Sequence, residues 1–337
     1  MPQPDEPGRD RVKRVALALA TILAAVACGG RGATAPADAG NAPLKLLPGE
    51  HEIAIRHEGR RRYYEVMVPA RASASAPLPV LLAFHGGGGN PSQFKRSAGI
   101  DQIAEREGFV VVYPAGTGVG RFLLTWNAGR ECCGRALALE VDDVGFTRAV
   151  VDDLARRVAV DRARVYVTGH SNGAGMTYRL AAEAPDLVAA IAPVAGASMG
   201  IARTSAEPIP LLHIHSVDDP RALYDGGLGP EFPGTGVRVE HSSVVDELKF
   251  WRDLNGCTGE AVVGEQRAGG AEAPDQAAEK LAWACGPRTP VVHWRLHGVG
   301  HGWPGGVERV SERLVGPGTT VISAAEEVWA FVSRFSR

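Results

Sequence analysis

One short segment of the chain combines a reactive side chain with the residues that a very tight turn requires. Residues 164–180 read RVYVTGHSNGAGMTYRL, with apolar residues before Gly169, a serine at position 171 and a helical pattern after Gly173. A G-x-S-x-G motif between a strand and a helix exposes the serine hydroxyl at a strained turn, where glycines avoid collisions with neighbouring backbone. The pattern predicts that Ser171 is a nucleophile; the alternative is a serine that only caps the helix.

A serine hydroxyl needs a general base, and a glycine-rich segment near the end of the chain supplies one. Residues 298–306 read GVGHGWPGG and follow a predicted strand, so this loop can bring His301 over the nucleophile. His297 is the alternative base. The remaining histidines after Ser171 lie inside predicted strands or at the start of a predicted helix: His213, His215, His241 and His293.

A carboxylate that orients the histidine is expected after the predicted strand 208–216. The following residues, SVDDPRALYDGG, contain Asp218, Asp219 and Asp225. A buried carboxylate at this place would hold the imidazole in the useful tautomer and stabilise the imidazolium. The spacing does not separate Asp218 from Asp219, and a solvated turn carboxylate is the alternative for both.

The segment HGGGGN at residues 85–90 follows a continuous apolar run and can supply backbone donors. Glycines allow N–H groups to approach a substrate oxygen closely, as in the HGGG-type loops of esterases. We expect the oxyanion hole to consist of the amides of Gly87 and Asn172, because charge develops on that oxygen in the transition state. The segment lacks the patterns of a phosphate-binding loop.

The elements that position these residues alternate between strands and helices from about residue 48 to residue 337. Such alternation predicts an α/β domain with a mostly parallel sheet and helices on both faces. Strands are predicted at 50–59, 61–69, 78–84, 109–113, 164–169, 187–196, 208–216 and 291–298, and helices at 90–108, 142–160, 174–185, 242–255 and 323–335. No second domain is predicted after residue 48.

The first residues are expected to direct export rather than to fold. Residues 1–28 contain a basic stretch, an apolar run and small residues before Cys28, the pattern of a signal peptide with a lipid-modified cysteine. The Pro- and Gly-rich residues 29–47 are predicted to be a flexible tether. We therefore expect an exported protein, either anchored to a membrane through lipid on Cys28 or secreted.

Export makes disulfides the expected state of the other four cysteines. Cys257 and Cys285 enclose an Ala- and Gly-rich insert, so they are the favoured pair. Cys132 and Cys133 are then either a vicinal pair or free thiols. No cysteine or histidine spacing predicts a metal site, and a formal net charge of −2 without basic runs argues against nucleic acid as a partner.

Taken together, these motifs resemble the exported polyhydroxybutyrate-depolymerase-like and feruloyl-esterase-like branch of the α/β-hydrolases. The resemblance covers roughly residues 48–337 and is carried by AFHGGGGN, TWNAGRECCG, VDDVGF, RVYVTGHSNGAGM, HSVDDPRALYDGG and GVGHGWPGG, in this order. It implies an α/β-hydrolase fold, a Ser-Asp-His triad, no metal or organic cofactor, and a carboxylic ester as substrate.

The resemblance also assigns individual residues. Ser171 and His301 match the nucleophile and base, and a frame that begins at His215 and includes Tyr224 places the acid at Asp219. The chain departs from the usual frame by having serine where glycine follows the first histidine, and by the extra residues PRAL.

Three further residues lie in segments that line the cleft of the family, and the resemblance therefore implies a substrate-binding role for Trp126, Asn127 and Trp303. For the tryptophans, plain packing is the alternative. The segments 226–240 and 258–284 are expected to be insertions that shape its rim. The expected activity is hydrolysis of feruloyl or acetyl esters of polysaccharides. The alternatives are a depolymerase of poly(3-hydroxybutyrate) or its oligomers, a serine peptidase, and a non-catalytic binding protein.

Overall fold

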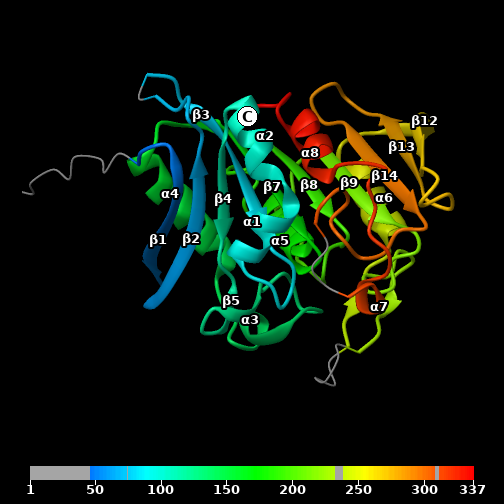
Figure 1. Cartoon of the computed structure of the whole chain (residues 1–337), viewed down its shortest axis with the longest axis horizontal. Helices are drawn as coiled ribbons and strands as arrows, with labels where there is room; N and C mark the ends of the chain where they lie inside the picture. The colour runs from blue at the N-terminus through cyan, green and yellow to red at the C-terminus, as the bar shows by residue number, and fades with distance from the viewer. Residues whose placement is uncertain (1–45, 74, 232–237, 308–310) are drawn as a thin grey trace, which may run out of the picture. The chain divides into compact units, whose positions relative to one another are not determined.

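A large mixed β-sheet forms the centre of the molecule (Figure 1). The computed structural model describes residues 46–73, 75–231, 238–307 and 311–337. The predicted signal peptide, Cys28 and residues 29–45 of the predicted tether lie outside the described residues.

The main sheet has the strand order β1-β2-β4-β3-β7-β8-β9-β14-β13-β12. Its strands are β1 Gly49–His57, β2 Arg60–Val68, β3 Leu78–Phe84, β4 Val110–Pro114, β7 Val160–His170, β8 Ala190–Val194, β9 Leu211–Ser216, β12 Thr258–Ala268, β13 Ala277–Ala284 and β14 Val291–His297. The block from β4 to β14 is parallel, and each edge carries two antiparallel strands. Short two-stranded ladders join β5 Thr117–Val119 to β6 Phe122–Thr125 and β10 Gly227–Leu228 to β11 Glu240–His241.

Helices cover both faces of this sheet, as the alternating pattern predicts. They are α1 Pro91–Ala98, α2 Ile100–Glu107, α3 Gly134–Ala138, α4 Asp143–Arg157, α5 Asn172–Glu183, α6 Val244–Leu254, α7 Glu312–Val315 and α8 Ala324–Val332. Apolar residues of α4, α5 and α6 belong to one buried cluster, and those of α1, α2 and α8 belong to a second one.

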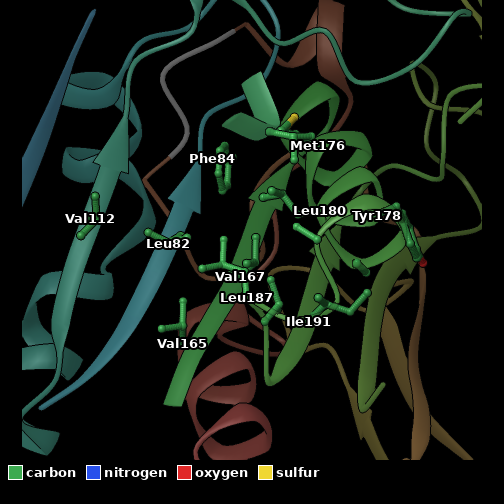
Figure 2. Packing of buried hydrophobic residues seen from close by; sticks show 14 of the residues in the cluster. Leu82, Phe84, Val112, Val165, Val167, Met176, Tyr178, Leu180, Leu187 and Ile191 are labelled. Carbon is green, nitrogen blue, oxygen red and sulfur yellow. The ribbon is translucent and has the colours of Figure 1, made fainter. Parts of the chain in front are cut away.

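Strand β3 shows why the sheet needs helices on both sides. All seven of its residues are buried. Leu82 and Phe84 point into the cluster with Met176 and Tyr178 of α5, seen in Figure 2, whereas Leu81 belongs to the opposite cluster. Because successive side chains of a strand point to opposite faces, a strand without polar residues has to be covered on both.

Both ends of the described domain lie at the edge of the sheet where the parallel strands begin. The N–H of Leu46 donates to the carbonyl of Arg157, just before β7 starts, at 3.0 Å. The N–H of Arg337 donates to the carbonyl of Ala163, in the first part of β7, also at 3.0 Å. The carboxyl ends of these strands therefore lie at the opposite edge.

Two of the predicted segments differ from the structure. The helix expected at 90–108 is broken into α1 and α2 by Gly99, whose φ of 71° ends the first helix. The segment expected to be a loop-like insert at 258–284 forms the antiparallel pair β12 and β13, which extends the sheet beyond β14. Most residues of β12 are exposed, so its sequence does not show the alternation of a half-buried strand.

The cysteines form two disulfides. Cys257 is bonded to Cys285, which confirms the favoured pair, and Cys132 is bonded to its neighbour Cys133 across a cis peptide. Among the described residues, no helix is long and apolar enough to cross a bilayer.

Candidate active site

The residues predicted to be functional lie in loops that follow four strands of the parallel block. His85 to Gly89 follow β3, Ser171 follows β7, Asp219 follows β9 and His301 follows β14. Because these strands are parallel, their carboxyl ends meet at one edge of the sheet, where ligands bind in open α/β sheets.

The turn that carries Ser171 is as tight as its sequence predicts. Ser171 has a φ of 57° and a ψ of −118°, between the end of β7 and the start of α5. A Cβ at Gly169 would lie 2.3 Å from the carbonyl oxygen of Gly173, and one at Gly173 would lie 2.2 Å from that of Phe84. Only glycine fits at either place. A positive φ at a non-glycine residue costs about 1–3 kcal/mol and persists only where the surroundings impose it.

His301 lies within hydrogen-bonding distance of Ser171. Its Nε2 is 2.8 Å from Ser171 Oγ, and its Nδ1–H donates to Asp219 Oδ2 at 2.7 Å. The backbone of His301 is held on both sides, since its N–H donates to Val315 at 2.5 Å and its carbonyl accepts from His170 Nε2–H at 2.8 Å. The alternative base, His297, instead contacts Glu279 of β13.

The structure brings Asp219, and not Asp218, to the histidine. Asp219 Oδ1 accepts the backbone N–H groups of Arg221 and Ala222 at 2.8 and 2.9 Å. Asp218 Oδ2 accepts the N–H of Gly298 at 2.7 Å, in an exposed loop. The two adjacent carboxylates therefore have different tasks: Asp219 orients His301, and Asp218 joins two loops.

The Asp219 carboxylate is held in its ionised form. Burial by itself would raise its pKa, but the neighbouring His301 and the hydrogen bond from His215 outweigh this effect and leave the pKa well below the ordinary 3.8. An ionised, buried carboxylate is what an imidazolium needs beside it while it carries the proton of the serine.

The two predicted oxyanion donors lie next to each other beside the nucleophile. A Cβ placed on Gly87 would lie 3.4 Å from Cβ of Asn172, and one on Gly86 would lie 3.4 Å from Cβ of Ser171. Asn172 is the first residue of α5, so its N–H has no acceptor within the helix. These backbone groups can donate to an oxygen of the substrate.

Trp126 supports this loop from beneath and does not line the cleft, contrary to the expectation. Its side chain is fully buried. The indole N–H donates to the carbonyl of His85 at 2.9 Å, and the ring meets Phe84 edge-on. The backbone of Trp126 also clamps the Asn172 amide, donating to Oδ1 at 2.7 Å and accepting from Nδ2 at 3.1 Å.

Of the other two residues expected to contact the substrate, one is structural and one lines the cleft. Asn127 is a structural residue, because its Nδ2 donates to Val141 at 3.0 Å and its backbone N–H donates to Asp143 Oδ2 at 2.8 Å. Trp303 does line the cleft. Its indole N–H donates to Ala98 at 3.1 Å and its ring meets Phe94 edge-on, and 8% of the residue remains exposed.

A cleft of about 420 Å³ opens beside Ser171 and His301. Its wall combines the glycine loop with apolar side chains, among them Phe94, Trp303, Val307, Leu314 and Val315. Three further histidines face it and are neutral at neutral pH, because burial lowers the pKa of His170 to about 3 and the pKa values of His85 and His241 to about 4. Arg221 also lines the cleft, and the apolar side chains of the wall suit a ligand with an apolar part.

Two positioning histidines were missed by the sequence analysis. His85 donates Nδ1–H to Gly86 at 2.8 Å and accepts the N–H of Gly116 on Nε2 at 3.1 Å, which fixes the glycine loop. His170 holds the backbone of His301. Their places immediately before the glycines and before Ser171 were visible in the sequence, but no spacing rule predicts such contacts.

One group of side chains has the composition of a metal site. Ligand atoms of His57, Glu58 and Asp142 lie within 4.8 Å of one another. Asp142 also accepts the N–H of Gly145 and so caps α4, and it pairs with His57 at 3.2 Å. The contacts of Asp142 are therefore explained by its role at the start of α4.

Comparisons with known proteins agree with this geometry. A family model described as "Esterase PHB depolymerase" matches residues 62–250. The NocK protein of Nocardia uniformis subsp. tsuyamanensis, whose name places it among the esterases, is 31% identical over 95% of this chain and 98% of its own length. Feruloyl esterase B of Piromyces equi is 29% identical over 58% of this chain, which spans 36% of that protein.

A solved structure shows the same fold. The acetyl xylan esterase from Aspergillus awamori superimposes with a TM-score of 0.51 at 16% identity, covering 74% of this chain and 94% of that one. A strained serine turn, a histidine loop and a glycine loop at one sheet edge are thus found in a chain that matches one family model along more than half of its length. The chain belongs to the PHB depolymerase family of esterases and is a carboxylic ester hydrolase with the α/β-hydrolase fold.

Proposed function

We propose that this esterase works through an acyl-enzyme formed on Ser171, and that its natural substrates are feruloyl or acetyl esters of polysaccharides. The observation that carries the mechanism is the continuous row from Ser171 Oγ through His301 to Asp219, with contacts of 2.8 and 2.7 Å. This row ends at the wall of the cleft, where an ester carbonyl can reach the serine.

Each group has a defined task in this proposal. Ser171 attacks the ester carbonyl while His301 Nε2 takes its proton, and Asp219 stabilises the resulting imidazolium. The N–H groups of Gly87 and Asn172 donate to the oxyanion, where one such donor is typically worth about 3 kcal/mol. The alcohol leaves with the proton from His301, and a water activated by the same histidine then releases the acid.

The choice of substrate is supported by two observations. A relative aligned over more than half of this chain is named a feruloyl esterase. The aromatic rings of Trp303 and Phe94 in the wall can pack against an aromatic acyl group. A second candidate substrate is an oligomer of poly(3-hydroxybutyrate), which the description of the matching family model favours and whose ester units are also uncharged.

The first test is the nucleophile. Ser171→Ala is expected to lower kcat on p-nitrophenyl acetate by a factor of about 10⁴ or more and to abolish labelling by a fluorophosphonate probe. Activity that survives the substitution would refute the mechanism. On the wild type, release of ferulate, acetate and hydroxybutyrate is then compared from methyl ferulate, acetylated xylan and hydroxybutyrate oligomers. The largest kcat/KM identifies the substrate class.

We also propose that the chain is exported, with residues 1–28 as a cleaved signal, residues 29–47 as a tether and residues 48–337 as the catalytic domain. The support is the sequence pattern before Cys28. Mass spectrometry of the mature protein tests it: a lipid-modified Cys28 at the N-terminus is expected, and an unmodified cysteine contradicts the lipid anchor.

A further inference from the structure

A row of buried polar side chains continues behind Asp219, and the reaction described above does not use it. His215 and His213 are successive inward-facing residues of β9, and Tyr178 belongs to α5. His215 Nε2 lies 3.3 Å from Asp219 Oδ2, His213 Nε2 lies 3.2 Å from His215 Nδ1, and Tyr178 Oη lies 2.8 Å from His213 Nδ1. All three side chains are buried.

The directions of these hydrogen bonds follow from one carbonyl group. His215 Nε2 is 2.9 Å from the carbonyl oxygen of Ala222, which can only accept, so Nε2 carries the proton. In a neutral ring Nδ1 is then an acceptor, and it receives the Nε2–H of His213. His213 Nδ1 is an acceptor in turn and receives the hydroxyl proton of Tyr178.

Neighbouring strands hold this row in place. The next strand, β14, contributes His293, whose Nδ1–H donates to the carbonyl of His213 at 3.1 Å and whose Nε2 accepts from Tyr224 at 3.0 Å. Burial keeps His213 and His293 neutral, because it lowers the pKa of both rings. His213 and His293 therefore do not compete with His301 for a proton at neutral pH.

We propose that His215 is a positioning residue that fixes the carboxylate of Asp219 for catalysis, with His213 and Tyr178 fixing His215 in turn. This inference rests on the proposed triad. Asp219 Oδ2 accepts the Nδ1–H of His301 and lies 3.3 Å from His215 Nε2, whose N–H is shared with the Ala222 carbonyl, while Oδ1 accepts two backbone N–H groups. Three hydrogen bonds and this shared N–H on two oxygens set both the plane and the rotation of the carboxylate.

Packing alone does not explain histidine at these positions. A leucine or phenylalanine would fill the same space without the cost of burying polar nitrogens, which is repaid only when each nitrogen has a partner. Here every ring nitrogen of His213 and His215 has one. The row therefore gives Asp219 a donor of fixed direction, which an apolar side chain cannot supply.

The experiment compares two amides of the same polarity at position 215. His215→Gln places its amide nitrogen near the former Nε2 and keeps a donor toward Asp219, whereas His215→Asn reaches only the former Nδ1. We expect the Gln variant to keep kcat within about fivefold of the wild type and the Asn variant to lose about 100-fold, the effect of a shift of about 1 Å. KM for p-nitrophenyl acetate should stay within about twofold in both, since neither side chain lines the cleft.

A double-mutant cycle separates positioning from general packing. In an Asp219→Asn background, His215→Asn should change the residual kcat by less than about threefold, because the partner through which it acts is gone. Equal kcat values for the Gln and Asn variants, or an undiminished effect in the Asp219→Asn background, would overturn the proposal.

Two further measurements keep the outcome decisive. If the Asn variant does not fold, ¹⁵N NMR of histidine-labelled wild type reports the tautomer: Nε2–H is expected for His215, and Nδ1–H overturns the proposal. A wild type that is inactive, or whose activity survives Ser171→Ala, signals failure of the proposed function instead. If the wild type is active and depends on Ser171, but substitutions at position 215 do not change kcat, only this inference fails.

Discussion

At the scale of single residues, Asp218 and Asp219 show how little separates the carboxylate proposed to act in catalysis from one that joins two loops. They are adjacent in the chain, yet only Asp219 turns into the interior, where it is 4% exposed. Asp218 turns outward and accepts one backbone N–H from Gly298. An asparagine can keep that single acceptor contact, but it cannot supply a negative charge beside an imidazolium.

Paired substitutions test this difference. Asp219→Asn is expected to lower kcat by a factor of about 10⁴, because the amide favours the wrong tautomer of His301 and leaves the imidazolium without a counter-charge. Asp218→Asn should stay within about threefold of the wild type, since one hydrogen bond in an exposed loop contributes only about 1 kcal/mol. Steady-state kinetics on p-nitrophenyl acetate measures both. A larger loss at position 218 than at 219 would reverse the assignment.

The sequence predicted some site residues and not others, for identifiable reasons. Ser171 and His301 were predictable because their flanking glycines reflect steric demands that only this kind of turn or loop makes. The choice between Asp218 and Asp219 needed the family resemblance. The two residues are adjacent, and the local backbone conformation alone determines which carboxylate points toward His301. The prediction that Trp126 lines the cleft was wrong. The sequence does not distinguish a tryptophan that packs beneath a loop from one that lines its surface, because both have an apolar ring with one N–H donor.

At the scale of elements, the strands buried on both faces were the easiest to predict. A short continuous apolar run such as that of β3 indicates a buried strand when a segment with helical periodicity follows it. The edge strand β12 was missed because neither of its faces is consistently covered, so its residues are not selected for alternation. A helix boundary at Gly99 was also missed, since an isolated glycine is tolerated inside helices.

At the scale of the whole molecule, buried neutral histidines should control stability in mild acid. Burial lowers the pKa of His85 to about 4 and the pKa values of His170 and His293 to about 3, from an ordinary 6.5. A depressed pKa in the folded state means that the stabilisation is complete above pH 6.5 and is lost as the pH falls toward the folded values. Below pH 6.5 these histidines bind protons in the unfolded chain but not in the folded chain.

This linkage gives a measurable slope. Each such histidine should lower the free energy of unfolding by about 1.4 kcal/mol per pH unit between about pH 6 and pH 4. Urea unfolding followed at pH 7, 6 and 5 measures this slope. His293→Gln should reduce it by about 1.4 kcal/mol per pH unit, which corresponds to one bound proton. The ionisation of Asp219 does not contribute in this window, because its folded pKa lies below the ordinary 3.8. A free energy of unfolding that stays constant from pH 6.5 to pH 5 would contradict the prediction.

The positions of the two ends of the described domain determine how the enzyme can face a surface. Leu46 and Arg337 are both fastened beside the start of β7, whereas Ser171 lies beyond its far end. Any attachment made through either end, whether a lipid, a resin or a fused protein, therefore joins the domain on the side away from the catalytic loops. An immobilised molecule then keeps its opening free on the far side, where large insoluble material can reach it.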